Sequence, residues 1–263
     1  MTTPDTTPDT SDWWQPLYDD LLATMLLERH DPAELDATLD FLVTQLGLGS
    51  RPGARVFDQC CGIGSLSLPL AARGYAVVGV DQAAAYVDRA RTEAAAAGSA
   101  IDYHAADARE FVPAQACAGV FNWWTSFGYG DDDDDNARML AAAFAALEPG
   151  GVFLLDTMNA VGLLRRFQPQ VVTRRETPDG ELVLVRDSRL ELETGTLHKR
   201  WTYFLPDGRR VEYPSAVRLY QPHELVALLR GVGFVDVELL GDLDGSRLSL
   251  DTLRCICRAR RPA

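Results

Sequence analysis

Hydrophobic and polar residues alternate along this chain in a way that predicts an α/β fold. Five short apolar runs are separated by segments whose apolar residues recur at helical spacing. The runs span residues 54–60, 75–81, 100–107, 118–124 and 152–158. Apolar runs that alternate with helices are typical of strands in a parallel sheet covered on both faces. Near the C-terminus, a helix at 222–231 precedes two more runs, at 235–241 and 253–259, so we predict a seven-stranded sheet.

The N-terminal region predicts helices that precede this sheet. Residues 1–12 are polar, acidic and contain prolines, which is typical of a disordered tail. Apolar residues then fall at helical spacing, and a second helix begins at an Asp31 cap that is followed by Pro32. We therefore expect residues 13–49 to form a helical lid and residues 50–167 to form the core of the α/β domain.

Residues 168–220 follow a different period. Apolar and polar residues alternate one by one, and the turn sequence PDG occurs at 178–180 and again at 206–208. Alternation with period two, broken by such turns, predicts an antiparallel β-meander inserted into the α/β domain. Residues 221–263 return to the pattern of helix and strand, and we expect them to complete the core.

Composition and charge narrow the class of protein. The chain has 263 residues and a formal net charge of −13, which disfavours a nucleic-acid partner because phosphate backbones would be repelled. The N-terminus lacks the basic start and apolar run of a signal peptide, and no apolar stretch approaches the roughly 20 residues of a membrane-spanning helix. We expect a cytoplasmic protein without a membrane partner, and a homodimer is the candidate assembly.

The sequence VFDQCCGIGS, residues 56–65, predicts a cofactor loop between the first strand and the helix after it. Gly62 and Gly64 would let the backbone approach a ligand closely, and the N-terminus of the following helix would offer amide donors. Asp81 ends the next strand, where its carboxylate can accept hydrogen bonds from both ribose hydroxyls of a nucleoside. The loop, the helix and this acid together predict a cofactor that contains a nucleoside.

The choice between cofactors depends on Asp58 and on the ends of the later strands. A carboxylate at Asp58 would repel the pyrophosphate of a dinucleotide such as NAD, but it would attract the cationic amino group of S-adenosylmethionine (SAM). Asp107, beside Ala108, is placed to meet the adenine edge, and Asn122 belongs to the end of the fourth strand. These strand-end residues favour SAM over NAD.

The same residues resemble the class I SAM-dependent methyltransferases, over about residues 50–160 and 220–260. VFDQCCGIGSLSLPLAARGYAVVGVD is similar to the first two motifs of that family, AADA to its adenine-binding motif, and LEPGGVFLLD to the segment that enters the fifth strand. The resemblance implies a Rossmann-like doubly wound sheet, SAM as cofactor, and methyl transfer. It adds Cys60, which stands where the family usually has its first glycine, Cys61 and Gln82 to the expected cofactor-binding residues. One departure is that the acid that often starts the fourth strand is absent.

Three further segments, NWWTSFGYGDDDDDN, DTMN and RLYQPHEL, are similar to a subgroup of bacterial methyltransferases that act on sugar amines and other secondary metabolites. This resemblance implies a small-molecule acceptor that is methylated on nitrogen or oxygen, with carbon the weaker candidate. The residues expected to contact the acceptor are Trp123, Trp124, Tyr129, Asn159, Arg200 and Arg218. Aromatic faces among them could hold an amine or the sulfonium by cation–π attraction.

Methyl transfer from a sulfonium needs a base only where the acceptor must lose a proton. The candidate catalytic residues are Tyr18, Tyr129, His198 and Tyr220. Tyr18 is also expected to contact the cofactor from the N-terminal helix. The aspartate run at 131–135 is expected to be solvated and to complement the dipole of the helix after it. We expect the cysteines to pack without a metal, because zinc would need further ligands nearby.

Two other enzyme functions fit part of this pattern. An NAD-dependent oxidoreductase would use a similar glycine loop, and a SAM-binding enzyme could catalyse a reaction other than methyl transfer. A non-catalytic binding protein is disfavoured by the full set of polar residues at the strand ends. Thermal stabilisation by SAM or by NADH would separate the two cofactor classes.

Overall fold

The computed structural model describes residues 17–28 and 31–263. The predicted tail at 1–12, together with residues 13–16 of the predicted helical lid, lies outside the described part of the chain. A seven-stranded sheet and a four-stranded sheet belong to different compact units. Of the described residues, the smaller unit comprises 17–26 with 168–217, and the larger unit comprises 27–28 and 31–167 with 218–263.

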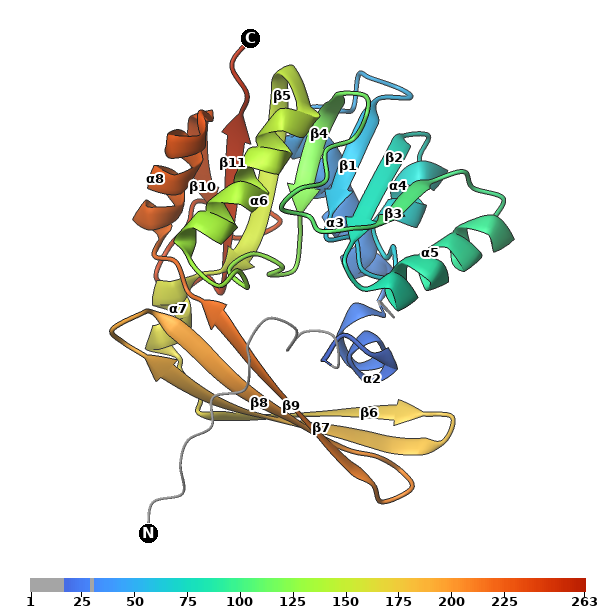
Figure 1. The fold of residues 1–263 in the computed structure, drawn as a ribbon, viewed down its shortest axis with the longest axis vertical. Coiled ribbons are helices and arrows are strands. Elements are labelled where there is room, and N and C mark those ends of the chain that lie inside the picture. Colours follow the sequence, from blue (N-terminus) through green and yellow to red (C-terminus); the bar gives the residue numbers. More distant parts are fainter. Residues whose placement is uncertain (1–16, 29–30) are drawn as a thin grey trace. The chain divides into compact units, whose positions relative to one another are not determined.

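Seven strands form the centre of the larger unit (Figure 1). They are β1 (Arg55–Gln59), β2 (Ala76–Asp81), β3 (Asp102–Ala105), β4 (Cys117–Asn122), β5 (Leu147–Met158), β10 (Val235–Leu240) and β11 (Arg254–Arg260). Their order in the sheet is β10-β11-β5-β4-β1-β2-β3. β1 to β5 run parallel, whereas β11 pairs antiparallel with both β5 and β10. This arrangement confirms the predicted seven-stranded, mostly parallel, Rossmann-like sheet.

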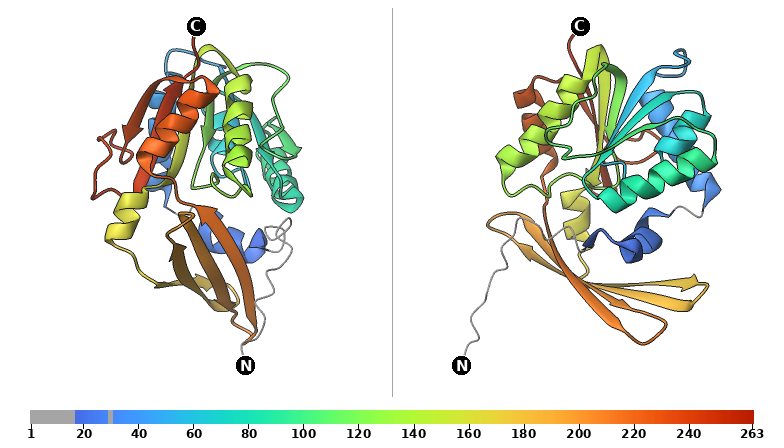
Figure 2. Two further views of the ribbon diagram at one scale, coloured as in Figure 1. Left: turned by 60° about the vertical axis from the view of Figure 1, so that its left-hand side comes forward. Right: turned by 45° about the vertical axis from the view of Figure 1, so that its right-hand side comes forward.

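Helices cover both faces of this sheet. The helices of the larger unit are α3 (Pro32–Gln45), α4 (Ser67–Ala72), α5 (Ala84–Ala96), α6 (Asp133–Ala146), α7 (Ala160–Arg165) and α8 (Pro222–Val232). Leu140 of α6 and Leu225 of α8 are buried in the apolar core on one face. Leu42 of α3 and Leu70 of α4 are buried in the core on the other face. Figures 1 and 2 show α6 and α8 on the side of the sheet opposite α3, so the sheet is doubly wound as predicted.

Local sequence signals set where several of these helices begin. The Asp31 side chain accepts a hydrogen bond from the Ala33 N–H at 2.9 Å, and Pro32 occupies the first helical position of α3. This confirms the predicted cap. At α6, Asp132 accepts a hydrogen bond from the Asp135 N–H at 2.8 Å. Short polar side chains at these positions satisfy amides that have no partner inside the helix.

The strand order creates a switch point at the carboxyl end of β1. β2 lies on one side of β1 and β4 on the other. In doubly wound sheets, ligands bind beyond the carboxyl ends of the strands at such a point. β1, β2 and β4 end at Gln59, Asp81 and Asn122, so each contributes a polar side chain to this edge.

An antiparallel sheet in the order β6-β7-β8-β9 makes up most of the smaller unit. Its strands are β6 (Gln170–Thr177), β7 (Gly180–Glu191), β8 (Thr196–Phe204) and β9 (Arg210–Arg218). Gly180 and Gly208 adopt positive φ values of 121° and 85° in the turns between β6 and β7 and between β8 and β9. Both are the glycines of the PDG sequences, and the predicted β-meander is confirmed.

The N-terminal segment contains α2 (Asp20–Leu22) followed by a π-helix, η2 (Ala23–Leu27). The sequence predicts a regular amphipathic helix here, so the wider π-turn is a departure from the expected geometry. The Tyr213 hydroxyl donates to Asp19 Oδ2 at 2.8 Å, and the Arg175 guanidinium donates to the Thr24 carbonyl. These contacts pack the segment against one face of the four-stranded sheet.

Candidate functional site

The loop that follows β1 has an unusual backbone. Cys60, Gly62 and Gly64 all adopt positive φ, at 67°, 54° and 81°. This conformation is strained for a residue that carries a Cβ atom, and glycine is the usual occupant. Cys60 therefore adopts a backbone conformation that glycine usually occupies. Cys61 is buried beside Tyr103 and Val87, as expected for a packing thiol.

Gly64 and Gly79 both lie against the side chain of Tyr103. A Cβ atom at Gly64 would lie 2.4 Å from the Tyr103 hydroxyl oxygen, and one at Gly79 would lie 2.7 Å from Cδ1 of the same ring. Both glycines make room for Tyr103. Among the described residues, a Cβ atom at Gly62 would meet only Leu27 Cδ1, at 3.6 Å. Gly62 thus has space beside its backbone for a ligand, and the roles of Gly62 and Gly64 toward the cofactor stay predictions.

Asp81 connects the end of β2 to this loop. Its Oδ2 accepts a hydrogen bond from the Gly62 N–H at 2.8 Å, and its Oδ1 accepts one from the Ala83 N–H at 2.9 Å. Burial raises the pKa of Asp81 above its ordinary value, although the two backbone hydrogen bonds act in the opposite direction. A carboxylate has about four acceptor positions, so each oxygen can still accept a bond from a ligand hydroxyl.

Asp58 is a buried carboxyl group, only 3% exposed, near the end of β1. Its Oδ2 accepts a hydrogen bond from the Ser67 hydroxyl at 2.6 Å. Burial raises the pKa of Asp58 to about 7, the Ser67 hydrogen bond partly offsets this, and the charge of Asp81 adds to it. Near neutral pH this group can therefore change its ionisation when a cation comes close.

A buried pair of amides lies at the ends of β1 and β4. Gln59 Nε2 donates to the carbonyl oxygens of Ala108 and Met139, both at 3.0 Å, and Asn122 Nδ2 lies 3.3 Å from Gln59 Oε1. The Asn122 Oδ1 atom is buried without a hydrogen-bond partner among the described residues. Gln59 was not predicted as a site residue, although its position beside Asp58 at a strand end was a usable signal. Its side chain joins the end of β1 to the loop after β3 and to α6.

Comparison with known proteins identifies the family. A family model described as "Methyltransferase domain" matches residues 56–151. A ubiquinone biosynthesis O-methyltransferase from Aromatoleum aromaticum is 31% identical over 203 residues, which cover 77% of this chain and 72% of that protein. The chain belongs to the class I SAM-dependent methyltransferases. Several other relatives that carry the same printed name are matched over about half to two thirds of their own length.

Solved structures of methyltransferases share this fold. The CcbJ methyltransferase from Streptomyces caelestis superimposes with a TM-score of 0.79 at 21% identity, covering 94% of this chain and 98% of the other. SAM-bound CalS10, an amino pentose methyltransferase from Micromonospora echinaspora, gives a TM-score of 0.65 at 21% identity and covers 87% and 90% of the two chains. At these identities the likeness concerns the fold.

The cofactor of this methyltransferase is SAM, and the residues at the switch point fit it. Asp81 offers acceptors for hydroxyl groups, Asp58 offers a carboxyl that a cation would ionise, and the backbone at Gly62 is open to a ligand. When bound, SAM supplies a methyl group that is already activated by its sulfonium. The residues around it have the tasks of orienting the acceptor and excluding water.

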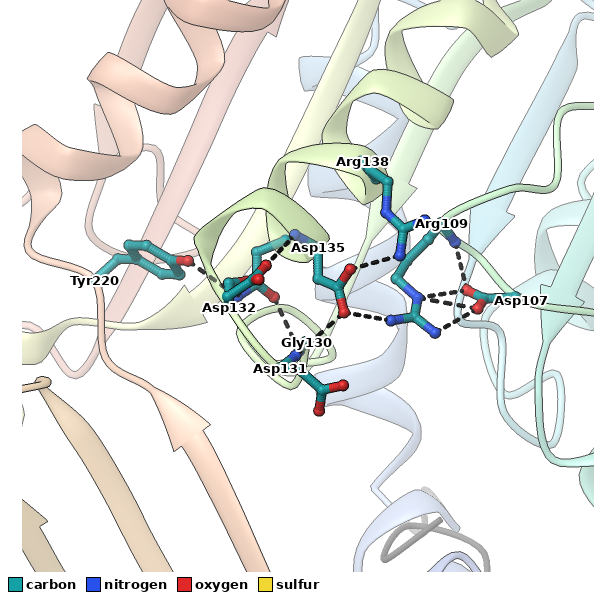
Figure 3. Close-up of polar contacts among 9 residues, drawn as sticks. Asp107, Arg109, Gly130, Asp131, Asp132, Asp135, Arg138 and Tyr220 are labelled. Atoms are coloured by element: carbon teal, nitrogen blue, oxygen red, sulfur yellow. Dashed lines mark hydrogen bonds and ion pairs between the residues drawn. The ribbon is translucent and has the colours of Figure 1, made fainter. Parts of the chain in front are cut away.

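Asp107, which the sequence places at the adenine edge, is paired with an arginine (Figure 3). Arg109 Nη2 lies 2.7 Å from Asp107 Oδ2, and the Arg109 N–H donates to Asp107 Oδ1 at 2.8 Å. Partial burial acts to raise the pKa of Asp107, but the bonds and charge of Arg109 outweigh it and lower the pKa. Arg109 also reaches Asp135 at 2.7 Å. The role of Asp107 and Ala108 toward adenine stays a prediction.

The aspartate run at 131–135 folds into the start of α6. Figure 3 shows Asp135 between Arg109 and Arg138, with Asp132 at the helix start. Partial burial acts to raise the pKa of Asp135, but its bonds to Arg138 and to the backbone, with the arginine charges, lower it. The run thus stabilises the helix start and links it to the loop after β3.

Tyr220 and Arg218 also contact the start of α6. The Tyr220 hydroxyl donates to Asp133 Oδ1 at 2.5 Å and accepts a hydrogen bond from Asn136 Nδ2 at 3.0 Å. Burial and the neighbouring Asp133 raise the pKa of Tyr220. The Arg218 Nη2 atom lies 2.8 Å from Glu224 Oε1. The catalytic role of Tyr220 and the substrate-binding role of Arg218 stay predictions, since both side chains are engaged with these acids.

The loop after β4 holds three of the predicted aromatic residues. Trp123 is 3% exposed, and its ring centroid lies 5.9 Å from that of Phe41, so it packs in the core. Trp124 and Thr125 adopt positive φ values of 57° and 61°. Burial raises the pKa of Tyr129 to about 12. Adjacent strained residues of this kind cluster at functional sites, which keeps Trp124 and Tyr129 as candidates for contact with the acceptor.

Asn159 was expected to bind the acceptor. Its Nδ2 atom donates to the carbonyl oxygens of Ser249 and Thr252, at 2.8 and 2.9 Å. It therefore anchors the segment before β11, and its Oδ1 atom is buried without a hydrogen-bond partner in the described part of the chain. Any contact with the acceptor stays a prediction.

His198, Arg200 and Tyr18 belong to the smaller unit. His198 Nε2 lies 3.1 Å from Glu191 Oε2, and Arg200 Nη2 lies 2.9 Å from Asp187 Oδ2. Both pairs lie on the same, more exposed face of the four-stranded sheet. Tyr18 is half-buried just before α2. Their predicted roles, including that of Tyr18 at the cofactor, stay predictions, as does that of the exposed Gln82 that follows Asp81.

The described residues contain neither a cluster of metal ligands nor a helix that could span a membrane. Across residues 17–28 and 31–263, no three or more His, Cys, Asp or Glu side chains are grouped so that they could hold a metal ion. All five cysteines are free thiols. None of the helices in these ranges is both long enough and apolar enough to cross a membrane.

Proposed function

We propose that this methyltransferase transfers the methyl group of SAM to a nitrogen or oxygen atom of a small molecule, in the cytoplasm and as part of secondary metabolism. The observation that carries the proposal is the pair of carboxyl groups, Asp58 and Asp81, on either side of the glycine loop. The printed names of its relatives support both acceptor atoms, since they include an O-methyltransferase and an amino pentose methyltransferase. The net charge of −13 argues against a nucleic-acid acceptor.

In this proposal each residue at the carboxyl ends of the strands has a separate role. Asp81 accepts hydrogen bonds from the ribose hydroxyls, Asp58 attracts the amino group, and Gly62 leaves space for the amino-acid portion. Trp124 and Tyr129 orient the acceptor from the loop after β4. An amine acceptor that arrives unprotonated needs no base before transfer, whereas a hydroxyl acceptor needs a group that takes its proton.

Incubation with methyl-labelled SAM and a panel of amines, amino sugars and phenols tests the proposal. We expect mass spectrometry to detect a labelled product together with S-adenosylhomocysteine. SAM that binds and remains intact while a true substrate is turned over would instead support a reaction other than methyl transfer. Stabilisation by NADH without stabilisation by SAM would support an oxidoreductase and contradict the proposal.

SAM binding is expected to weaken as the pH falls below about 7. The pKa of Asp58 is about 7, and only the ionised carboxylate attracts the cationic amino group. Affinity should therefore fall by up to about tenfold for each pH unit below that pKa. Calorimetric titration with SAM between pH 5.5 and 8.5 measures this dependence.

Asp58→Asn is the control for this titration. It should bind SAM more weakly at pH 8 and should show no such slope. The same carboxyl affects folding, because its folded-state pKa exceeds the unfolded value of 3.8, so its contribution to stability is lost as the pH rises through about 7. Asp58→Asn should remove that loss as well. An equal slope in both proteins would assign the pH dependence to another group.

A further inference from the structure

One face of the four-stranded sheet, here named the inner face, carries the large buried side chains of that sheet. β7 and β8 pair so that Leu184 lies opposite Tyr203 and Arg186 lies opposite Trp201. Residues directly opposite each other in an antiparallel pair share a face, as do residues two apart on one strand. Leu184, Trp201 and Tyr203 are each 5% exposed or less. Two cations, Arg186 and Lys199, therefore share the face of these buried residues.

The two cations lie near the same aromatic ring, and no carboxylate of the described residues pairs with either of them. Arg186 Cζ is 5.7 Å, and Lys199 Nζ 5.5 Å, from the centroid of the Trp201 ring. Arg186 Nη2 donates to the Thr173 hydroxyl at 3.2 Å. Across the described residues 17–28 and 31–263, neither cation forms an ion pair. Cation–π attraction to one ring compensates only part of the cost of burying two like charges.

On the opposite face of the same sheet, arginines form ion pairs with carboxylates. Arg200 pairs with Asp187 at 2.9 Å, and Arg174 pairs with Glu181 at 2.7 Å. The acids of these strands therefore stand beside cations on the exposed face. In the described part of the chain, the inner face carries more cations than carboxylates, whereas the formal net charge of the whole chain is −13.

Two buried donors on the inner face also lack a partner. The Arg186 Nε and Tyr203 hydroxyl atoms are buried without a hydrogen-bond partner among the described residues. Burial and the charge of Arg186 lower the pKa of Lys199 to about 8, and burial lowers the pKa of Arg186. Among the described residues, the unsatisfied atoms are thus one guanidinium nitrogen and one hydroxyl, both of which can donate, and the Lys199 ammonium lies near the same Trp201 ring. A group that accepts hydrogen bonds and carries negative charge would complement these donors and cations.

We propose that Arg186, Lys199 and Tyr203 bind a carboxylate or phosphate group of a small-molecule ligand, with Trp201 as an apolar wall beside it. A planar guanidinium and a nearby ammonium suit both kinds of oxyanion. The anion-binding face itself is independent of methyl transfer.

Other charged groups on the inner face do not replace this anion. Asp19 packs on it from the N-terminal segment, but its two carboxylate oxygens accept hydrogen bonds from the Leu22 N–H and the Tyr213 hydroxyl. Arg175 shares the face and donates to the Thr24 carbonyl. Tyr203 and Tyr213 are further titratable groups on the inner face.

Lys199 makes the test specific, because it is the only lysine among the 25 Lys and Arg residues of the chain. Reductive methylation with ¹³C gives one lysine signal beside that of the N-terminal amine. We expect the lysine signal to titrate with a pKa of about 8, and addition of inorganic phosphate to raise that pKa, because an anion stabilises the ammonium form. Acetate, titrated separately, tests the carboxylate. A response to phosphate alone assigns the site to phosphate groups, and a response to both extends it to carboxylates.

Arg186→Gln and Arg189→Gln form a matched pair of variants. Arg186→Gln should weaken binding of the effective anion about tenfold, the usual effect of losing one charge-assisted hydrogen bond. It should also raise the Lys199 pKa in the absence of anions, because a like charge has been removed. Arg189 is exposed on the same strand, on the opposite face, and Arg189→Gln should leave both quantities unchanged.

The outcomes separate this inference from the proposed function. A wild-type protein that binds SAM but shows no response of Lys199 to either anion overturns the inference and leaves the function intact. Equal losses in the two arginine variants would also overturn it, because they would indicate attraction by bulk charge. A response of Lys199 to anions, in a protein that transfers no methyl group to any acceptor, would support the inference and contradict the function.

Discussion

Replacing Asp81 by alanine is expected to abolish SAM binding at ordinary ligand concentrations. In the proposed site this carboxylate accepts hydrogen bonds from both ribose hydroxyls, and it also holds the Gly62 and Ala83 N–H groups that shape the loop. Hydrogen bonds to a charged group contribute about 1.5–3 kcal/mol each, so losing two of them weakens binding at least about 100-fold. Isothermal titration of SAM into the wild-type and variant proteins measures the change.

A matched control separates the loss of this contact from the loss of one negative charge. Asp88 lies on the exposed side of α5, where it pairs with Arg91 of the same helix. Asp88→Ala should bind SAM as the wild type does. Thermal unfolding should show that Asp81→Ala is still folded. Near-normal SAM affinity in a folded Asp81→Ala protein would remove the central contact of the proposed site.

The main features of the fold could be predicted because they depend on local patterns. Continuous apolar runs mark strands buried on both faces, and the PDG turns and the Asp31 cap are set by neighbouring residues. The π-helix at 23–27 could not be predicted, because the leucine spacing before it also fits an ordinary helix. Tyr213 and Arg175, which hold this segment on the sheet, are far away in sequence.

The strand-end acids of the candidate site were also visible in the sequence, but their partners were not. Asp58 and Asp81 follow directly from where β1 and β2 end. The pairing of Tyr220 with Asp133 joins residues that only the folded chain brings together. Arg109 is a different case, since it stands two residues after Asp107, and a local acid–arginine pair was a signal that could have been used.

Asp156 was not predicted as a functional residue, yet it shapes the loop that follows β4. It is 4% exposed and pairs with Arg254, with Oδ2 to Nη2 at 2.7 Å and Oδ1 to Nε at 3.0 Å. Its Oδ2 also accepts a hydrogen bond from the Trp124 N–H at 3.1 Å, and its carbonyl accepts one from the Thr125 N–H at 3.0 Å. The two loop residues with strained positive φ are thus both bonded to Asp156.

Replacing Asp156 by alanine is expected to lower the free energy of unfolding by about 3–5 kcal/mol. Burial acts to raise the pKa of Asp156 and the charge of Arg254 acts to lower it, so the carboxylate depends on its partner. Removing one member of a buried ion pair leaves the other charge without compensation, which costs about that much. The Trp124 N–H would lose its acceptor too. Urea denaturation of the wild-type and variant proteins measures the difference.

The double variant Asp156→Leu/Arg254→Met distinguishes the stability of the fold from the shape of the loop. Removing both charges leaves no uncompensated ion, so most of the lost stability should return. Leucine still cannot accept the hydrogen bond from the Trp124 N–H, so the strained turn should relax. We expect SAM affinity to stay near that of the wild type while kcat/KM for the acceptor falls, because Trp124 and Tyr129 would no longer be held in place. If a stable double variant transferred methyl groups at the wild-type rate, Asp156 would act on stability alone and the loop after β4 would not position the acceptor.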